Sequence, residues 1–309
     1  MLNKISDQEV VQLLNPTEEP VALDSAEGKK FLSETRKYII GQILRFFFYS
    51  RFRHAIRFQF RLKSNKGVKD LHESFYKMSV ETHLGNFSNQ LRGTGTYRIN
   101  HKMVVRCIGA HVMACNRTIV GNIIAQLSPK SICEVGAGSG STIFYLASRF
   151  PDIRFTGYEL AQSGVDLCKS LQEHGLYGTS YGQAYNLPAN SDDSIRQIQF
   201  HCASAYNIGC NDKEYDLVYT FSALEQMAAD LPKALAEIRR IAKKYVIFHE
   251  PFPEVNDFYG RLYLWAGDYF RSSVAEIERH GFRAIGVFDN LPIKGTHGYG
   301  ILVAEVVEF

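Results

Sequence analysis

Three alternating glycines follow a short apolar segment and an acid near the middle of the chain. The segment reads Cys-Glu-Val-Gly-Ala-Gly-Ser-Gly-Ser, with Glu134 two residues before Gly136. Glycine adopts positive φ and lacks a Cβ, so Gly136, Gly138 and Gly140 allow a tight strand-to-helix turn and close approach of a ligand. A dinucleotide site would need its third glycine at position 141, which is Ser141 here. A carboxylate at Glu134 favours the cationic ammonium group of an amino-acid ligand and would repel a pyrophosphate.

A second acid lies at the end of a predicted strand. Residues 154–159 read Arg-Phe-Thr-Gly-Tyr-Glu, and Glu159 is followed by Leu160. One carboxylate accepts two hydrogen bonds, so an acid at the end of the second strand of a nucleotide-binding sheet binds both hydroxyls of a ribose. Glu159 therefore indicates a nucleoside, and by itself it does not separate a nicotinamide dinucleotide from other nucleosides.

These two segments resemble motif I and the second strand of the class I S-adenosylmethionine-dependent methyltransferases. The resemblance covers residues 128–309 and depends on the order of several short elements. It implies S-adenosylmethionine as the cofactor, with Glu134 fixing its methionine part and Glu159 its ribose. The other cofactor contacts implied in these two segments are Gly136, Ala137, Gly138, Gly140 and Leu160.

Later segments continue the resemblance, with departures. Where the family usually has Gly-Asp-Ala after the third strand, this chain has Ala203, Ser204 and Ala205. Ser204 keeps the capacity to hydrogen-bond the adenine but lacks the charge of the aspartate. The fourth strand ends at Phe221, which together with Ser204 and Ala205 completes the implied cofactor contacts. The following loop reads Leu-Glu-Gln and ends at Gln226, so the histidine found there in many small-molecule members is missing.

His249 and Glu250 stand at the end of the predicted fifth strand. Ligands of open α/β sheets bind outside the carboxyl ends of the strands, so this pair is placed to touch a substrate. Methyl transfer from a sulfonium mainly requires alignment of the nucleophile and exclusion of water. For a hydroxyl acceptor we predict His249 or Glu250 as the general base, and the alternative is a hydrogen-bonded structural role.

Two further side chains are candidates for the same pocket. His297 lies in the predicted loop before the last strand, and Glu225 either lines the pocket or caps a helix. The sequence shows no set of Asp and His residues at metal-ligand spacing, so we predict no metal.

The second half of the chain alternates strand and helix patterns, which is typical of a parallel sheet built from βαβ units. Strands are predicted at 131–135, 154–159, 197–201, 216–221, 245–249, 282–289 and 300–306. Helices are predicted at 141–149, 161–174, 231–243 and, with a break, at 255–280. The loop at 290–299 is too short for a right-handed crossover, so the last strand should run antiparallel to its neighbour. The sequence therefore predicts a Rossmann-like, seven-stranded α/β fold.

The first half of the chain has longer apolar-periodic segments with few turn signals. They predict helices at 7–14, 28–49, 68–84 and 101–127. We therefore expect a mainly helical accessory or lid region over residues 1–127 and a cofactor-binding domain over residues 128–309.

Basic residues are concentrated between Lys29 and Lys66. This stretch holds eleven Lys or Arg residues and one acid, Glu34, whereas the whole chain has a net charge of +3. From Arg51 onwards basic and apolar residues alternate with period two, which favours a strand with one basic face over a continuing helix. The stretch predicts a solvated lid or a dimer-forming arm, with a nucleic acid or a membrane surface as alternative partners.

Composition and cysteine usage are those of an ordinary globular protein. Hydrophobic residues make up 45% and charged residues 22% of the chain. The six cysteines show no Cys-x-x-Cys pair, and the first twenty residues contain no apolar signal segment. These features predict a cytoplasmic protein with reduced thiols.

The leading hypothesis is a methyltransferase acting on O or N of a small molecule. The first alternative is a methyltransferase acting on RNA or protein through the basic arm. The second alternative is a protein that binds S-adenosylmethionine without catalysis, which the missing acid at Ser204 and the missing histidine at Gln226 would explain.

Overall fold

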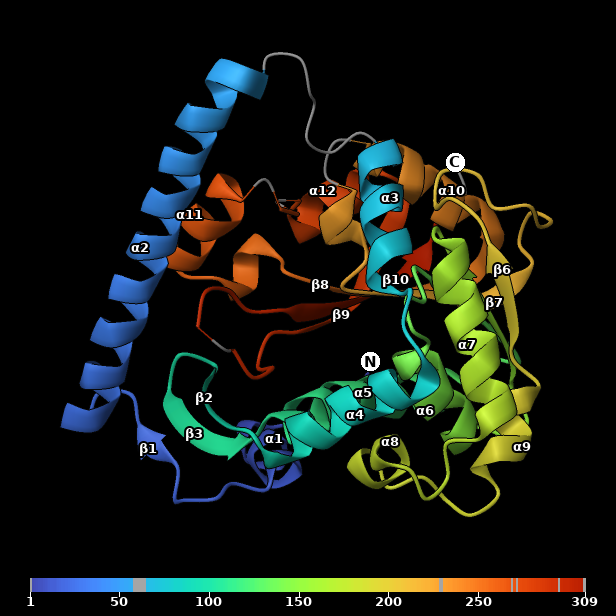
Figure 1. Cartoon of the computed structure of the whole chain (residues 1–309), viewed down its shortest axis with the longest axis horizontal. Helices are drawn as coiled ribbons and strands as arrows, with labels where there is room; N and C mark the ends of the chain where they lie inside the picture. Colours follow the sequence, from blue (N-terminus) through green and yellow to red (C-terminus); the bar gives the residue numbers. More distant parts are fainter. Residues whose placement is uncertain are drawn as a thin grey trace.

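A seven-stranded sheet forms the centre of the C-terminal half of the molecule (Figure 1). The computed structural model describes residues 2–57, 65–227, 230–267, 269–270, 272–293 and 295–307. In order across the sheet the strands are β6 (Gln199–Cys202), β5 (Arg154–Glu159), β4 (Ser131–Val135), β7 (Tyr215–Phe221), β8 (Ala242–Glu250), β10 (Gly300–Val306) and β9 (Phe282–Phe288).

The predicted direction of the last strand is confirmed. β10 pairs antiparallel with both β8 and β9, and the pairs that join β6, β5, β4, β7 and β8 are all parallel. The short loop between β9 and β10 has no room for a crossover helix, so the chain turns back directly into the space beside β8. The Rossmann-like α/β fold with an antiparallel last strand is therefore confirmed.

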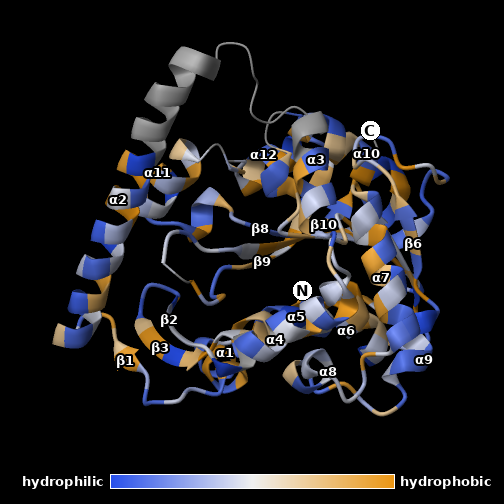
Figure 2. Ribbon diagram, viewed as in Figure 1, coloured by the Kyte–Doolittle hydropathy of each residue, from blue (hydrophilic) through white to orange (hydrophobic). Residues whose placement is uncertain are grey.

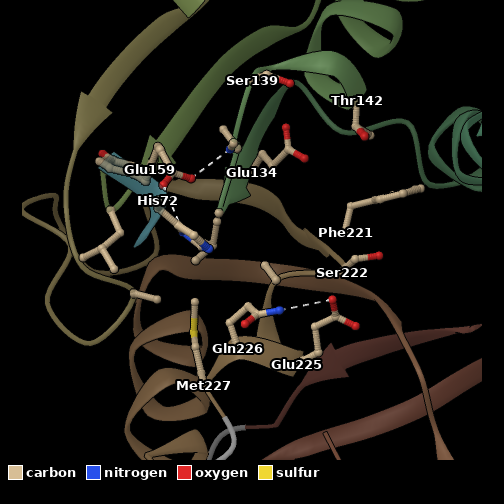
Figure 3. A pocket seen from close by; sticks show the side chains of 18 of the residues that line it. His72, Glu134, Ser139, Thr142, Glu159, Phe221, Ser222, Glu225, Gln226 and Met227 are labelled. Atoms are coloured by element: carbon tan, nitrogen blue, oxygen red, sulfur yellow. Dashed lines mark hydrogen bonds and ion pairs between the residues drawn. The ribbon is translucent and has the colours of Figure 1, made fainter. Parts of the chain in front are cut away.

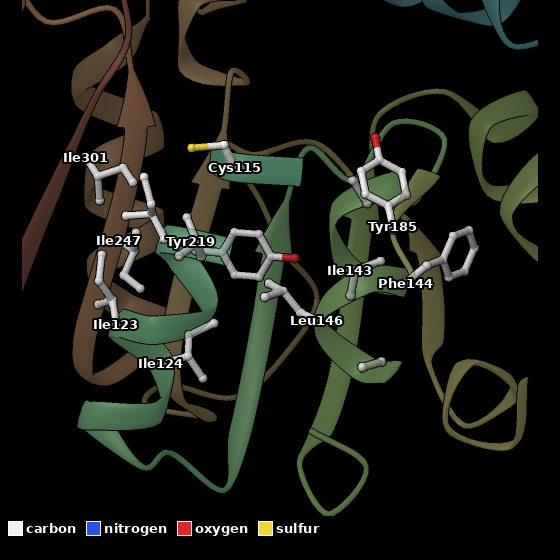
Figure 4. Close-up of a cluster of buried hydrophobic side chains, with 14 of the residues drawn as sticks. Cys115, Ile123, Ile124, Ile143, Phe144, Leu146, Tyr185, Tyr219, Ile247 and Ile301 are labelled. Carbon is white, nitrogen blue, oxygen red and sulfur yellow. The ribbon is translucent and has the colours of Figure 1, made fainter. Parts of the chain in front are cut away.

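Both faces of the sheet are buried by helices, because side chains of a strand alternate between the two faces. Ile247 of β8 and Ile301 of β10 belong to one apolar cluster, which the neighbouring helices complete with Ile123 and Leu146 (Figure 4). The adjacent residue Phe248 belongs to a second cluster, on the other face.

The helices around the sheet match the predicted pattern in most places. The helices of the C-terminal half are α6 (Ser141–Arg149), α7 (Gln162–His174), α8 (Ser180–Ala184), α9 (Ser191–Arg196), α10 (Leu231–Ile241), α11 (Phe258–Ala266) and α12 (Val274–Arg279), with short 3-10 turns at Leu224–Gln226 and Pro253–Val255. The predicted break within 255–280 is confirmed, and α8 and α9 were not predicted. Both are single short turns, too brief to show a helical period.

The N-terminal half is mainly helical but contains a small sheet. Its elements are α1 (Asp7–Leu14), β1 (Val21–Ala22), α2 (Ala26–Arg57), α3 (Asn65–Phe75), α4 (Val80–Arg92), β2 (Thr94–Ile99), β3 (Met103–Ile108) and α5 (Gly109–Leu127). The strands pair in the order β1-β3-β2.

Two helix predictions in this half were wrong in part. The predicted helix 101–127 begins only at Gly109, because β2 and β3 form a hairpin whose turn holds Asn100 and His101 at positive φ (46° and 52°). A turn of this kind matches the twist of the flanking strands. The predicted helix 68–84 is interrupted between α3 and α4, where the Ser79 hydroxyl accepts a hydrogen bond from the Thr82 amide and caps α4.

The basic arm is helical as far as the structure describes it. The predicted strand beginning at Arg51 is wrong through Arg57, where α2 ends, and residues 58–64 lie outside the described residues. The earlier part of α2 packs beside α11, with the Arg36 guanidinium over the Tyr259 ring (Figure 1). Its described part carries hydrophilic and hydrophobic residues along its length (Figure 2). No helix that the structure describes is both long enough and apolar enough to span a bilayer. Nucleic acid, a membrane surface and a second copy of the chain stay predictions as partners of this arm.

The division at residues 127 and 128 also stays a prediction. The last helix of the N-terminal half, α5, ends at Leu127, and the first strand of the large sheet, β4, begins at Ser131. However, Leu14 of α1 and Ile119 of α5 belong to the same apolar cluster as Ile132 of β4. The N-terminal region and the sheet therefore share one core.

Leu302 offers a test of how far this core determines stability. Leu302 in β10 is fully buried, and we expect Leu302→Ala to lower the free energy of unfolding by about 2–5 kcal/mol because it leaves a cavity. The matched control Leu71→Ala removes a side chain that is 66% exposed, and it should change stability by less than about 0.5 kcal/mol. Urea unfolding of both variants is the measurement, and equal losses would contradict the packing described here.

Candidate active site

The glycine loop between β4 and α6 has the geometry that its sequence predicts. Gly136, Gly138 and Gly140 all have positive φ (82°, 57° and 75°), and α6 begins directly after Gly140. The amides of Gly136 and Ala137 donate to the Tyr158 carbonyl at 2.8 and 2.9 Å, which ties the loop to β5. These hydrogen bonds hold the main chain of the loop at the carboxyl end of the sheet. Glycine alone tolerates the positive φ angles of this loop without strain.

Glu134 is buried at the end of β4, below the loop. It is 2% exposed, and burial raises its pKa to about 8, while neighbouring Tyr219 and Arg117 act in the opposite direction. A protonated carboxyl group at this site loses its proton readily when a cation binds beside it. Glu134 is thus suited to receive an ammonium group, as the sequence predicts.

Glu159 connects the end of β5 to the glycine loop. One carboxylate oxygen accepts a hydrogen bond from the Gly138 amide at 2.8 Å, and the other accepts one from the Ala161 amide at 3.0 Å. Each oxygen has a further lone pair, so the carboxylate keeps the capacity to accept ribose hydroxyls. The imidazole of His72 lies 3.9 Å from the same carboxylate.

These acids line one cavity of about 490 Å³ at the carboxyl ends of β4, β5 and β7 (Figure 3). All the cofactor contacts predicted from the sequence except Gly140 line it, namely Glu134, Gly136, Ala137, Gly138, Glu159, Leu160, Ser204, Ala205 and Phe221. Gly140 lies just beyond, where the Phe144 ring occupies the space that a Cβ would take. The structure thus brings together in one place residues from four segments of the chain.

Arg117 of α5 reaches the same cavity, and the sequence analysis missed it. Its side chain is 3% exposed and donates hydrogen bonds to the hydroxyls of Thr142 (3.1 Å), Ser141 (2.9 Å) and Tyr185. These neutral hydroxyls are the hydrogen-bond partners that the described residues give it. The polar pair Asn116 and Arg117, placed among buried apolar residues of α5, is a signal that could have indicated this site.

Helix α3 covers the cavity from the N-terminal side. It belongs to the predicted helix 68–84 and to the region expected to act as a lid, but its site residues were not predicted. His72, Phe75 and Tyr76 line the cavity, with the Tyr76 ring close to Gly138. The helix is fixed by the carboxylate of Glu73, which accepts hydrogen bonds from the amides of Gln162 and Ser163 at 2.8 and 3.0 Å. Since these amides begin α7, the acid also stabilises the positive end of that helix.

Comparison with known proteins bears on this site. Residues 133–248 match the profile of the family described as "Methyltransferase domain". The matched part of the chain, residues 133–248, is a methyltransferase domain. The resemblance to this family, inferred above from the glycine loop and the later segments, is confirmed over the matched residues.

Individual relatives are more distant. The chain is 32% identical over 98 residues to the phthiotriol/phenolphthiotriol dimycocerosates methyltransferase of Mycobacterium tuberculosis. The aligned segment covers 30% of this chain and 34% of that protein. The chain thus matches about a third of the length of the curated relatives.

Solved structures resemble the fold at low identity. Magnesium protoporphyrin IX methyltransferase from Synechocystis PCC 6803, solved with bound SAH, is 16% identical over 79% of this chain and 100% of that chain, with a TM-score of 0.48. Geranyl diphosphate C-methyltransferase from Streptomyces coelicolor A3(2) is 13% identical over 64% of this chain and 83% of that chain, with a TM-score of 0.44.

His249, near the end of β8, is packed behind the cavity and does not line it. It is 1% exposed and stacks between the rings of Phe221 (3.8 Å between centroids) and Tyr299 (5.1 Å). Burial lowers its pKa to about 3, so the imidazole is neutral at physiological pH. Its predicted role as a general base gains no support from this position and stays untested.

Glu250 is buried as well. One of its carboxylate oxygens accepts hydrogen bonds from the amides of Ala223 (3.1 Å) and Leu224 (3.0 Å). Burial raises its pKa to about 8. These hydrogen bonds hold the loop after β7 in place, as expected for the structural role that was the alternative for His249 and Glu250. A direct catalytic role of Glu250 stays untested.

Glu134 should leave a signature in the pH dependence of stability. Its folded pKa of about 8 lies above the value of about 4.3 expected in the unfolded chain, so the native state binds more protons between these values. The contribution of Glu134 to the free energy of unfolding of the ligand-free protein should therefore be lost as pH rises from about 5 to 8. Below about pH 6.5 the lowered pKa of His249 acts in the opposite direction, so the net fall is expected between about pH 6.5 and 8. Glu134→Gln should make this slope shallower. Glu250, whose pKa burial also raises to about 8, should account for part of the remaining slope. Urea unfolding at a series of pH values is the measurement.

The matched control is Glu19→Gln, which changes an exposed acid and should leave the slope as it is in the unaltered chain. An unchanged slope in Glu134→Gln would show that Glu134 titrates normally.

Proposed function

We propose that the chain transfers a methyl group from S-adenosylmethionine to oxygen or nitrogen of a small molecule. The observation that carries this proposal is the convergence of Glu134, the bare glycine backbone and Glu159 on one cavity. Glu134 is suited to an ammonium group, the glycine backbone allows a ligand to pack closely, and Glu159 is suited to a ribose. A ligand that joins an amino acid to a nucleoside would meet all three. The family match over residues 133–248 supports the same activity.

The residues present fit S-adenosylmethionine group by group. Glu134 would receive the ammonium group and Glu159 the ribose hydroxyls. Ser204 and Ala205, which line the same cavity, would contact the adenine. The cofactor supplies an activated methyl group on a sulfonium. The role of the chain is to bind both reactants, orient the acceptor and exclude water.

Arg117 adds an anion site to this set. A buried guanidinium is costly unless an anion compensates its charge, and its hydrogen-bond partners in the described structure are neutral hydroxyls. The carboxylate of the methionine part would provide this anion beside Glu134, whose own pKa already responds to Arg117. We therefore assign Arg117 to the carboxylate end of the cofactor.

A small-molecule acceptor is favoured because a second cavity adjoins the first. RNA or protein as acceptor through the basic arm, and cofactor binding without catalysis, remain the competing hypotheses. A cytoplasmic location and a homodimer also remain predictions.

Two measurements test the proposed function. Isothermal titration calorimetry should detect binding of S-adenosylhomocysteine and no binding of a nicotinamide dinucleotide. Incubation with methyl-labelled S-adenosylmethionine and fractionated cell extract should then transfer label to a low-molecular-mass fraction. Binding of the dinucleotide alone would refute the cofactor assignment, and label in RNA or protein would favour the first competing hypothesis. Tight binding without transfer to any fraction would favour the second.

Arg117→Met tests the assignment of the carboxylate. The variant should bind S-adenosylhomocysteine about 10- to 100-fold more weakly, because it loses a charge-assisted hydrogen bond. It should bind 5′-methylthioadenosine, which lacks the amino-acid part, almost as well as the unaltered protein does. Calorimetry with both ligands measures the difference, and binding of methylthioadenosine also shows that the variant is folded.

The control for Arg117→Met is Arg149→Met on α6, whose guanidinium bonds to Asn122 and Thr118 outside the cavity. It should leave both affinities unchanged. Equal weakening of the two ligands by Arg117→Met would place Arg117 away from the cofactor carboxylate.

A further inference from the structure

A second cavity of about 650 Å³ lies against the first one. Phe75, Tyr76, Met113, Arg117, Ser139 and Ser141 line both cavities, so the two share a wall. A volume of this size accommodates a small organic molecule. The cavity is therefore placed to hold an acceptor next to the proposed cofactor site.

The walls of this second cavity are rich in aromatic rings. Tyrosine and phenylalanine side chains line it from the end of α3 and the residue after it, from β2, from the segment after α8 and from the loop before β10, namely Phe75, Tyr76, Tyr97, Tyr185 and Tyr299. Within the described part of the chain no carboxylate and no lysine line it. Aromatic rings favour stacked and edge-to-face contacts with other rings, so these walls favour a planar aromatic ligand over a saturated one of the same size. Arg117 is the charged side chain that lines this cavity within the described part of the chain.

A polar pair lies where the two cavities meet. Tyr299 lines the second cavity and donates a hydrogen bond of 2.9 Å to the carboxylate of Glu225, which lines the first. The imidazole of His297 lies 3.4 Å from the same hydroxyl. Stacking of the Tyr299 ring on buried His249 fixes the direction of the hydroxyl.

We propose that the second cavity binds an aromatic acceptor carrying a hydroxyl group, and that the Tyr299–Glu225 pair takes up the proton of this hydroxyl during methyl transfer. The proposal rests on the proposed function and deepens it. In this proposal Tyr299 and Glu225 are the catalytic residues. His249 is a positioning residue, because its ring stacks on the ring of Tyr299.

The proton movements balance. The acceptor hydroxyl gives its proton to the oxygen of Tyr299 while Tyr299 passes its own proton to Glu225. The acceptor oxygen forms a bond to the methyl carbon as the carbon–sulfur bond breaks, and the sulfur keeps the electron pair. The products are a methyl ether and S-adenosylhomocysteine, and Glu225 afterwards releases the proton to water.

The ligand class is tested with 2-naphthol as the probe and decahydro-2-naphthol, its saturated counterpart, as the control. Both are titrated by calorimetry into the protein saturated with S-adenosylhomocysteine. We expect 2-naphthol to bind at least about tenfold more tightly, because only its rings are planar. Equal affinity, or no binding of 2-naphthol, would overturn the assignment of an aromatic acceptor.

The proton relay is tested with Tyr299→Phe and Glu225→Gln. Each should lower kcat for formation of 2-methoxynaphthalene by about 100-fold or more, while the dissociation constants of 2-naphthol and S-adenosylhomocysteine change less than about threefold. In both variants the remaining rate should rise with pH toward the pKa of free naphthol, since ionised naphthol no longer needs a base. The matched control Tyr177→Phe alters a tyrosine that is 53% exposed and should keep the rate and the pH profile of the unaltered protein.

Unchanged kcat and pH profile in both variants would overturn the relay. Failure of the proposed function is distinguishable from this result, because it would abolish the binding of S-adenosylhomocysteine before any acceptor is added.

Discussion

The hydrogen bond from the Gly138 amide to the Glu159 carboxylate is the constraint on which the cofactor cavity depends. It joins the glycine loop to the acid that ends the neighbouring strand β5. The amides of Gly136 and Ala137 reinforce the connection through the Tyr158 carbonyl. Because the loop needs three positive φ angles, it would be free to collapse without these bonds. The parallel register of β4 and β5 brings the partners together.

Not every strand end at the carboxyl edge of the sheet lines the cavity. β4, β5 and β7 present Glu134, Glu159 and Phe221 to the cavity. At β8 the side chain of His249 is enclosed between Phe221 and Tyr299 instead. This enclosure follows from β10, which inserts next to β8 and brings the loop before it over the strand end. The antiparallel last strand thus shapes the site as well as the fold.

The N-terminal region contributes more to the site than a cover. Arg117 comes from α5, Phe75 and Tyr76 from the end of α3 and the residue after it, and Tyr97 from β2. The clamp between Glu73 and the start of α7 fixes α3 over the cofactor cavity. The carboxyl ends of the strands therefore supply the proposed cofactor contacts, whereas the second cavity is built largely from residues that precede β4.

The sequence by itself determined the sheet, the direction of its last strand and the set of residues that line the first cavity, which we propose as cofactor contacts. These features depend on local patterns, since a glycine loop with its acid and a strand that ends in an acid are complete within a few residues. The hairpin of β2 and β3 was missed because its pairing outweighs the helical period of 101–108. Only the tertiary structure decided the position of Arg117, the enclosure of His249 and the pairing of Tyr299 with Glu225, because each depends on elements distant in sequence that meet at one edge of the sheet.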